Sequence, residues 1–354
     1  MRIAVTGATG NIGTSVLHRL GEDGTHTLVG LARRTPPDRG GRTVDWVGVD
    51  LTDDACLPVL ERAFTGADAV VHLAWGFQPS HDLHYLEELG VGGTRRVLTA
   101  LTAAGVPHLV HMSSIGAYSP KHDDTPVDES WPTDGVPTSR YSVHKAAAER
   151  LLDAHEQSEG PTLLTRLRPG IVGQRAAGSA LLRYGVPALV PAAVLDHVPI
   201  LPVDRRLTVP MVHADDVADA VARALERSSG GAFNLAADPP ITTALIAEAL
   251  GARPIHVPSA VLRPLMSLAW HARLQQVDAG WLDMAFALPL LDTSRARREL
   301  GWSPRVDAVT VLREVLAGMR ERASGDSPVL RVRTVAGALR DAVTRGPVGE
   351  RDRP

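Results

Sequence analysis

The sequence predicts an α/β protein built around a doubly wound parallel sheet. The chain begins with an unbroken apolar run at residues 3–5, which is typical of a strand buried on both faces of such a sheet. Glycines then recur at three-residue intervals, at positions 7, 10 and 13, before a segment with helical spacing. Further apolar runs alternate with helical segments as far as about residue 173. This alternation is typical of a parallel sheet covered by helices.

The glycine turn predicts a binding site for a dinucleotide. A strand that turns on glycines into a helix is the first half of a dinucleotide-binding βαβ unit. Gly7 permits the tight turn, Gly10 lets the backbone approach a pyrophosphate, and Gly13 lets the helix pack on the strand. The pyrophosphate would face free N–H groups at the positive end of the helix dipole. A glycine turn without a ligand is the alternative, but the buried strand directly before it favours cofactor binding. The candidate cofactor-binding residues of the turn are Gly7, Thr9, Gly10, Asn11, Ile12 and Gly13.

The next two strands bear on which cofactor binds. The second strand, within residues 25–34, ends where an acidic side chain would bind the ribose 2′-hydroxyl of NAD. Ala32 stands there instead and Arg33 and Arg34 follow, which favours the 2′-phosphate of NADP. NAD stays open, because a pair of solvated arginines is common at a strand end. The third strand closes on Asp50, which either bonds the adenine or caps the helix that follows.

Two strand ends supply candidate groups around the cofactor. The fourth strand, within residues 67–76, ends in small residues whose backbone can line the cofactor. The fifth strand ends in Ser113 and Ser114, at the edge where ligands of open α/β sheets bind. The polar stretch 119–139 follows without periodicity, and we expect it to form a rim of the active site.

Tyr141 and Lys145 are the candidate proton-transfer pair. They are separated by four residues in a segment, 141–157, whose composition predicts a helix, so both side chains lie on one face. An ordinary tyrosine has a pKa of about 10 and is a poor base at neutral pH. A neighbouring ammonium favours the phenolate and brings proton transfer within reach. A pair with a packing role alone is the alternative.

Composition bounds the remaining possibilities. The 354 residues are 44% apolar and 22% charged with a net charge of −3, which gives no general attraction to nucleic acid or anionic membranes. The single Cys56 excludes an internal disulfide and indicates a reducing compartment. No secretory signal or membrane span is evident, so we expect a cytoplasmic protein. His81 and His84 form a close pair without a further ligand cluster, and we expect no metal site.

The alternation of strands and helices weakens beyond residue 173. We expect residues 1–173 with 213–236 to form the cofactor-binding domain, and 174–212 with 237–315 to form a small mixed substrate lobe. The stretch 174–212 is rich in Leu, Val, Ala and Pro, which favours a fairly apolar substrate pocket. Residues 320–354 are expected to be a peripheral or disordered tail with an amphipathic helix at about 329–344.

These motifs together resemble the extended short-chain dehydrogenase/reductase superfamily and, more narrowly, the NAD-dependent epimerase/dehydratase family. The resemblance spans about residues 1–310, with the motifs in the family's order. It is carried by TGATGNIG (6–13), Asp50, HLA (72–74), the serine pair ending four residues before Tyr118, YSVHK (141–145), RPGIVG (168–173), HADDVA (213–218), FNLA (233–236) and LDTSRARRELGWSP (291–304).

The resemblance implies a Rossmann-type domain that binds NAD(P), with a small C-terminal substrate lobe. It implies that Ser114 hydrogen-bonds the substrate oxygen, that Tyr141 is the acid/base, and that Lys145 binds the nicotinamide ribose and lowers the pKa of the tyrosine. It also implies a homodimer through the helices near 82–104 and 141–157. Further residues that it places near the cofactor or in structural positions are Leu51, Leu73, Ala74 and Arg168 for the cofactor and Asp215 and Asp216 for the second lobe.

Three departures from the family pattern concern the substrate. Gly90 stands where many relatives carry the Asn of an N-V-x-G-T string, so a relay role at that position is in doubt. Ile171 and Val172 replace an Asn that is frequent in sugar-nucleotide enzymes, and Ser119 follows Tyr118 where those enzymes tend to have Gly. These differences weaken the case for a nucleotide-sugar substrate and leave the redox core intact.

Two enzymatic interpretations and one non-enzymatic interpretation follow. The first is an NAD(P)-dependent oxidoreductase of the epimerase/dehydratase type, and the second is an NAD(P)H-dependent reductase of a small apolar ketone or aldehyde. The third is a cofactor-sensing binding protein, which usually lacks the catalytic Tyr or Lys. Both residues are present here, which favours an enzyme acting on a small-molecule substrate.

Overall fold

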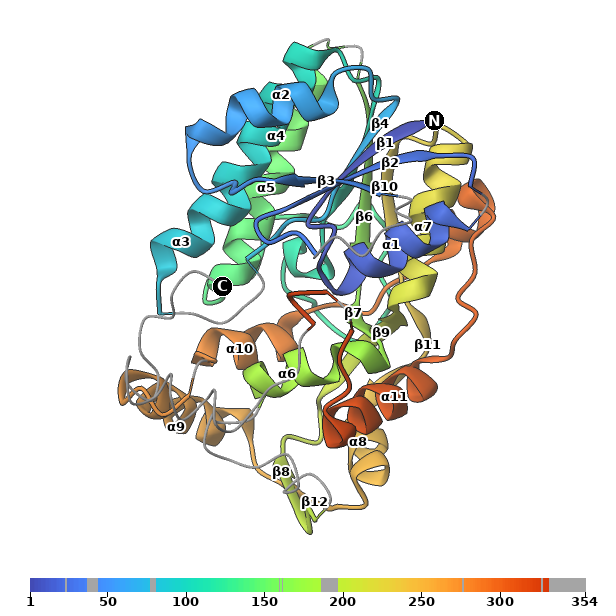
Figure 1. Cartoon of the computed structure of the whole chain (residues 1–354). Coiled ribbons are helices and arrows are strands. Elements are labelled where there is room, and N and C mark those ends of the chain that lie inside the picture. The colour runs from blue at the N-terminus through green and yellow to red at the C-terminus, as the bar shows by residue number, and fades with distance from the viewer. Residues whose placement is uncertain are drawn as a thin grey trace.

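The central element of the fold is a seven-stranded, all-parallel sheet with the strand order β10-β6-β5-β4-β1-β2-β3 (Figure 1). The computed structural model describes residues 1–22, 24–36, 44–76, 81–158, 160, 162–185, 197–275, 277–325 and 327–330. Strand β1 lies between β2 and β4, so the order of the strands reverses there and leaves a crevice at their carboxyl ends. The predicted doubly wound sheet is confirmed. The strands are β1 (Arg2–Thr6), β2 (Thr27–Ala32), β3 (Val44–Gly48), β4 (Ala69–His72), β5 (His108–Met112), β6 (Leu163–Pro169) and β10 (Gly231–Leu235).

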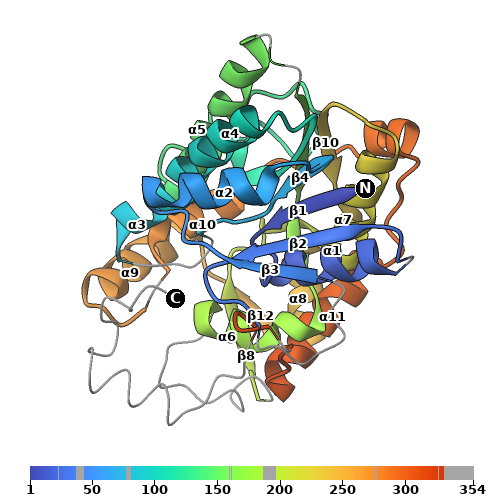
Figure 2. The same cartoon turned by 45° about the horizontal axis from the view of Figure 1, so that its top comes forward.

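Helices cover both faces of this sheet, as Figure 2 shows most clearly. Because side chains alternate along a strand, Ile3 and Val5 of β1 join the core on one face while Ala4 joins the core on the other. All three are fully buried, as the unbroken apolar run predicted. The helices on the Ile3 face are α1 (Asn11–Gly21) and α7 (Ala214–Glu226), and those on the Ala4 face are α2 (Leu57–Phe64), α4 (Gly93–Ala104) and α5 (Arg140–Gln157).

The turn from β1 into α1 depends on glycine for steric reasons. Gly7 has a φ of 70°, in the left-handed region that favours glycine. A Cβ on Gly7 would lie 2.6 Å from the Ala74 nitrogen, and one on Gly13 would lie 2.3 Å from the Gly7 carbonyl oxygen. The predicted close packing of helix on strand at Gly13 is confirmed by this approach.

A smaller lobe lies below the sheet in the view of Figure 1 and contains a mixed sheet of three strands. Strand β9 pairs in parallel with β7 and antiparallel with β11, and apolar residues of α8 and α11 pack on it. The small mixed lobe that the sequence predicts is therefore present, while its exact boundaries stay a prediction. Its elements are β7 (Ile171–Gly173), β8 (Ile200–Val203), β9 (Thr208–His213), β11 (Ala237–Thr242), β12 (Arg253–His256), α6 (Gly178–Gly185), α8 (Thr243–Leu250), α9 (Ser259–His271), α10 (Ala279–Ala287) and α11 (Ala308–Glu321).

Asp216, in the first turn of α7, ties the two lobes together. Its carboxylate accepts hydrogen bonds from the backbone N–H groups of Arg305 and Val306, at 2.9 and 3.2 Å. Its backbone oxygen accepts the indole N–H of the fully buried Trp302 at 2.8 Å. Its neighbour Asp215 has a side chain that is 70% exposed. These contacts give Asp216 the structural role that the resemblance implied.

The described part of the C-terminal tail packs on the body of the protein. Ser327 donates a hydrogen bond to the carbonyl of Thr9 in the glycine turn, and Leu330 is buried against Ala177 and Ala180. The amphipathic helix predicted at about 329–344 lies almost wholly outside the described residues. Among the helices that the structure describes, none has the length and apolar character needed to cross a bilayer.

Candidate active site

Ser114 and Tyr141 meet at the carboxyl edge of the parallel sheet. Ser114 follows β5, and its hydroxyl accepts the backbone N–H of Gly116 at 2.9 Å. Tyr141 lies in the first turn of α5, and its phenol is hydrogen-bonded to Ser114. Gly116 makes this approach feasible, because a Cβ there would lie 2.7 Å from Cε1 of the Tyr141 ring. The structure therefore brings together the serine and the tyrosine that the sequence predicted.

Lys145 lies one turn further along α5 and is almost fully buried. Its side-chain ammonium donates to the carbonyl oxygen of Met112 at 2.9 Å. The same nitrogen lies 3.5 Å from the centre of the Trp75 ring and 6.0 Å from the centre of the Tyr141 ring. Burial lowers the pKa of Lys145 to about 7, against the opposing charge of Glu149. The proposed proton-transfer pair thus lies on one helix face, as its spacing predicted.

The phenol of Tyr141 departs from the expectation that Lys145 lowers its pKa. Burial raises the pKa of Tyr141 to about 12, and the hydrogen bond with Ser114 offsets only part of that rise. In this structure the ammonium is directed to Met112 and Trp75, which explains why it does not counteract the burial of the phenol.

Two tryptophans that the sequence reasoning did not single out flank the tyrosine. The ring centre of Trp75 lies 6.3 Å from that of Tyr141 with the planes at 80°, and that of Trp281 lies 5.2 Å away at 32°. Trp75 directly follows the HLA motif, so the sequence could have predicted its position beside the candidate cofactor site. Trp281 comes from α10 of the second lobe, and no local signal in the sequence brings it to Tyr141. The two tryptophans give the phenol of Tyr141 an apolar surrounding on two sides.

A buried charge cluster supports α5 from below. Glu149, one turn after Lys145, is fully buried and accepts hydrogen bonds from Ser113 at 2.6 Å and from Arg168 at 2.9 and 3.0 Å. Arg166 lies 3.2 Å from the same carboxylate. Burial alone would raise the pKa of Glu149, but Arg168, Ser113 and Arg166 together hold it below its ordinary value.

Arg168 uses its whole guanidinium inside the protein. Besides Glu149, it donates to the hydroxyl of Tyr118 at 3.1 Å and to the carbonyl of Glu129 at 3.0 Å. The carboxylate of Glu149 outweighs the effect of burial and raises the pKa of Arg168. The contact between Arg168 and the cofactor that the resemblance implied stays a prediction.

The glycine turn fits the pyrophosphate of a dinucleotide. Gly10 precedes α1 as its N-cap without a side-chain hydrogen bond, and the first turn of the helix carries no acidic residue. The side-chain nitrogen of Asn11 donates to the carbonyl of Val172 at 3.2 Å, and Gln174 donates to the side-chain oxygen of Asn11 at 2.8 Å. The turn therefore presents backbone N–H groups and a positive helix end in a cradle that a Cβ would fill.

The remaining predicted cofactor residues lie at the ends of the strands next to this turn. The guanidinium of Arg33 donates to the hydroxyl of Tyr85 at 2.8 Å. Asp50 accepts the backbone N–H of Thr52 at 3.1 Å, and Asp53 caps the following turn by accepting the N–H of Ala55 at 2.9 Å. The capping role that the sequence left open for Asp50 is thus met by Asp53. Of the other predicted residues, Leu51 and Thr9 are buried, and Ile12, Leu73 and Ala74 are partly buried.

The described residues contain no group of three His, Cys, Asp or Glu side chains arranged to hold a metal ion. His81, one of the two histidines noted in the sequence, stacks on Trp270 with ring centres 4.4 Å apart.

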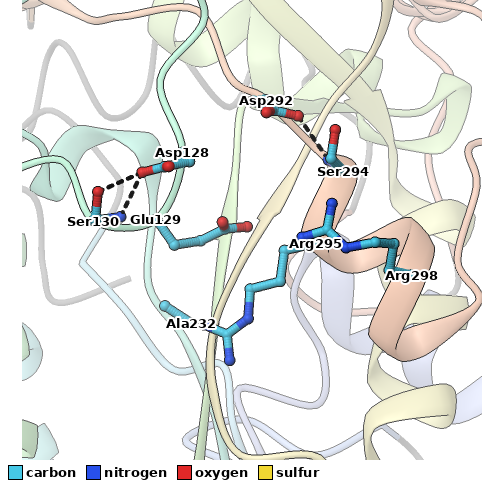
Figure 3. Close-up of a pocket in the computed structure, with 8 residues that line it drawn as sticks. All are labelled: Asp128, Glu129, Ser130, Ala232, Asp292, Ser294, Arg295 and Arg298. Atoms are coloured by element: carbon cyan, nitrogen blue, oxygen red, sulfur yellow. Dashed lines mark hydrogen bonds between the residues drawn. The ribbon is translucent and has the colours of Figure 1, made fainter.

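A polar pocket of about 560 Å³, whose lining does not include Ser114, Tyr141 or Lys145, lies beside the outer strand β10 (Figure 3). The carboxylate of Glu129 accepts the backbone N–H of Asn234 at 2.8 Å, and burial raises the pKa of this carboxyl group. The guanidinium of Arg295 lies over the ring of Phe233 and pairs with Glu299 at 3.1 Å. These contacts indicate a structural role in covering the sheet edge. The pocket is lined by Asp128, Glu129, Ser130, Ala232, Asp292, Ser294, Arg295 and Arg298.

The parallel sheet and the glycine turn define an α/β protein of the dinucleotide-binding class, in which Ser114, Tyr141 and Lys145 lie close together at the carboxyl edge of the sheet. The model of the NAD dependent epimerase/dehydratase family matches residues 3–236. The chain therefore belongs to that family of NAD-binding oxidoreductases, and its structural neighbours are extended short-chain dehydrogenase/reductase proteins.

Comparison with individual proteins supports this assignment. The chain is 28% identical over 324 residues to an uncharacterized protein of Mycobacterium tuberculosis, covering 91% of this chain but only 30% of that protein. It is 29% identical over 318 residues to a UDP-glucose 4-epimerase of Mycolicibacterium smegmatis, covering 86% of this chain and 94% of the relative. The structure of a UDP-glucose 4-epimerase of Thermus thermophilus in complex with NAD aligns with a TM-score of 0.67 and 26% identity, over 90% of this chain and 99% of that one.

Proposed function

We propose that the protein is an NAD(P)-dependent oxidoreductase that interconverts an alcohol and a carbonyl group, with Tyr141 as the acid/base. The observation that carries the proposal is the hydrogen bond between Tyr141 and Ser114 beside the buried ammonium of Lys145, at the carboxyl edge of the sheet. Membership in the NAD dependent epimerase/dehydratase family supports the same chemistry.

The chain's own residues divide the work of this reaction. The bound nicotinamide supplies the hydride acceptor or donor. Ser114 holds the substrate oxygen by a hydrogen bond, in reach of the phenol of Tyr141. Because burial keeps the pKa of that phenol near 12, Tyr141 is protonated at neutral pH and able to donate to a carbonyl oxygen. In the oxidative direction Tyr141 must first lose its proton, and the hydrogen bond with Ser114 favours that loss by lowering the pKa of the phenol. The apolar walls of Trp75 and Trp281 exclude water from this transfer.

The reaction type that the relatives favour is epimerisation or dehydration. The solved structure from Thermus thermophilus and the curated relative from Mycolicibacterium smegmatis are both described as UDP-glucose 4-epimerases. A nucleotide-sugar substrate is therefore the first class to assay.

A second candidate is the reduction of a small apolar ketone or aldehyde. It is favoured by the two indole rings of Trp75 and Trp281 within 6.3 Å of the phenol of Tyr141. The apolar cluster that contains Tyr141 extends to Ile115, Met284 and Leu288. An apolar wall of this kind suits a substrate with little polar surface around its reacting carbon.

We propose NADP as the cofactor, with NAD as the alternative. Arg33 follows the second strand, where a 2′-phosphate would lie, and one terminal nitrogen of its guanidinium donates to the hydroxyl of Tyr85. The structure from Thermus thermophilus is described as a complex with NAD, which supports the alternative. Replacing Arg33 by Ala should weaken NADPH binding about tenfold and leave NADH binding almost unchanged. Equal losses for the two cofactors would remove Arg33 from 2′-phosphate recognition.

The proposed function is tested with Tyr141→Phe and a matched control, Tyr118→Phe. The variants are assayed with UDP-sugars by chromatography of the products, because epimerisation or dehydration leaves NAD(P)H unchanged overall. They are assayed with cyclic ketones and aldehydes by NAD(P)H formation or consumption, and for cofactor binding by fluorescence. Loss of the Tyr141 hydroxyl should lower turnover by about 10²- to 10⁴-fold with cofactor affinity retained. Tyr118→Phe, which alters a buried phenol bonded to Asn234, should retain turnover. Unchanged turnover in Tyr141→Phe would remove this residue from the mechanism.

Absence of turnover with every substrate, despite tight cofactor binding, would instead favour the cofactor-sensing interpretation. The homodimer implied for the helices near 82–104 and 141–157 is a separate proposal. It is tested by light scattering of the purified protein.

A further inference from the structure

We infer that Trp75 is a positioning residue of this active site, whose indole face holds the ammonium of Lys145 beside Tyr141, and that Gly90 provides the space for that indole. The inference rests on the proposed roles of Lys145 and Tyr141. It adds a residue that acts on the reaction through Lys145.

The first support is the geometry of the three groups. The ammonium nitrogen lies 3.5 Å from the centre of the Trp75 ring, the two aromatic ring centres are 6.3 Å apart, and the nitrogen is 6.0 Å from the Tyr141 centre. The indole is therefore in direct contact with the ammonium and presents its edge or face to the phenol at a nearly perpendicular angle of 80°. A cation over an aromatic face at this distance is attracted by the quadrupole of the ring.

The second support is the site of the ammonium, which offers few other partners for a charge. Lys145 is 2% exposed, and its ammonium donates a hydrogen bond to the carbonyl oxygen of Met112. An ammonium has three donors, so a single carbonyl leaves most of its capacity to the surrounding groups. The face of Trp75 supplies negative electrostatic potential at the ammonium, so no carboxylate besides that of Glu149 is needed near the phenol of Tyr141.

The third support is the packing of Gly90 against the indole. A Cβ on Gly90 would lie 3.1 Å from Cζ2 and Cη2 of Trp75, closer than ordinary contact. Gly90 belongs to the π-helical turn Glu88–Gly92, which precedes α4. The glycine that departed from the family pattern in the sequence thus has a physical reason here, because a side chain at this position would displace the ring from Lys145.

The ionisable neighbours of Lys145 define what its titration will report. Glu149 faces it from the same helix, and its charge favours the ammonium. His72 of β4 and His111 of β5 face it from the sheet. Burial lowers the pKa of His72 to about 3 and that of His111 well below its ordinary value, so both stay neutral near pH 7. Tyr141 titrates near pH 12. A proton lost near neutral pH in this cluster therefore belongs to Lys145.

The chain allows a direct test because it contains two lysines, Lys121 and Lys145. Protein labelled with ¹³C at the lysine ε-carbon gives two resonances, and Lys121→Arg assigns them. Lys121, whose ammonium pairs with Asp124, supplies the second resonance as an internal reference. The wild-type protein is compared with Trp75→Phe, which keeps an aromatic face, and Trp75→Leu, which keeps an apolar side chain without one.

We expect Lys145 to titrate near pH 7 in the wild type and within about 0.3 unit of that value in Trp75→Phe. In Trp75→Leu the pKa of Lys145 should fall by about one unit, because burial remains and the attraction of the ring is lost. In turnover assays the alkaline limb of kcat should move by the same amount and direction. An unchanged or raised pKa in Trp75→Leu would overturn the inference, as would equal shifts in the two variants.

Gly90→Ala provides a second, independent variant. It should lower the pKa of Lys145 in the wild-type background by displacing the indole, and it should have no effect in the Trp75→Leu background. Equal effects in both backgrounds would contradict the coupling of Gly90 to Trp75. These titrations use the free protein and need no turnover, so their failure is distinct from retained activity in Tyr141→Phe, which would refute the proposed function itself. Melting temperatures of all variants verify that each is folded.

Discussion

Replacing Glu149 by Gln should destabilise the protein strongly, because this carboxylate is the centre of a buried charge cluster. Glu149 is fully buried and lies within 3.2 Å of the guanidinium groups of both Arg166 and Arg168. The amide of Gln is neutral and cannot accept from all of its present donors, so one guanidinium loses its buried counter-charge. Breaking a buried pair from one side costs about 3–5 kcal/mol.

This free energy translates into a measurable shift of the thermal midpoint. With an unfolding entropy of about 2.1 cal/mol/K per residue over 354 residues, a loss of this size lowers the midpoint by about 4–7 °C. The measurement is thermal denaturation followed by circular dichroism at pH 7. The matched control is Glu156→Gln, which removes another partner of Arg166 whose side chain is 43% exposed. We expect the control to lose less than about 1 kcal/mol.

The pH dependence of the thermal midpoint provides a second test of the same prediction. The pKa of Glu149 in the folded protein lies below its ordinary value, so the unfolded chain binds more protons at acid pH. The contribution of the cluster is complete above about pH 4.5 and is lost as the pH falls through the folded-state value. The difference between wild type and Glu149→Gln should narrow in that range. A midpoint that falls no further in Glu149→Gln than in Glu156→Gln would refute the reasoning.

Three further predictions concern other buried groups. Asp216→Asn should lower the free energy of unfolding, measured by urea denaturation, by about 1–3 kcal/mol, because it weakens the hydrogen bonds to two backbone N–H groups. The exposed Asp215→Asn should lower it by less than about 0.5 kcal/mol. Equal losses in the two variants would contradict the role of Asp216 in joining the lobes. Gly13→Ala should lower the free energy of unfolding by about 2–3 kcal/mol, because its Cβ would lie 2.3 Å from a carbonyl oxygen. Gly21→Ala, whose nearest contact is at 3.9 Å, should raise it by about 0.5–1 kcal/mol. No change in Gly13→Ala would show that the turn can relax around the added methyl group. Lys145→Met should raise the free energy of unfolding by about 1–2 kcal/mol at pH 7. The difference between this variant and the wild type should disappear between pH 7 and 10.5, because over that range the lysine is protonated in the unfolded chain and neutral in the folded protein. A difference that does not change with pH would mean that Lys145 is not buried as a charge.

The parts of the fold that the sequence predicted are those with strong local periodicity. The helix expected over 11–21 is α1 with those bounds, and the helix expected over 141–157 begins one residue earlier, at Arg140. The helix expected near 82–104 is interrupted by the π-helical turn at 88–92, where Gly90 packs against the indole of Trp75. Near residue 173, where the sequence predicted that the alternation of strands and helices weakens, β6 and β7 follow each other closely but belong to two different sheets.

The candidate site was predicted in part for the same reason. Tyr141 and Lys145 are related by helix geometry, and Ser114 by its place at a strand end, so local rules sufficed. Trp281 reaches Tyr141 from α10, across 140 positions of sequence, and only the packing of the second lobe brings them together. Glu149 looks like a solvent-facing helix residue in the sequence, yet two arginines of β6 make its burial favourable.

The carboxylate of Glu129 has a consequence for association between molecules. It occupies the backbone donor of Asn234 on the outermost strand of the sheet, where a strand of another chain could otherwise add. The loop that carries Glu129 therefore blocks the addition of a further strand at this edge of the sheet. A variant without this carboxylate would keep the candidate active-site residues but would expose an unpaired backbone donor on the edge strand. We therefore expect it to be poorly soluble at high protein concentration.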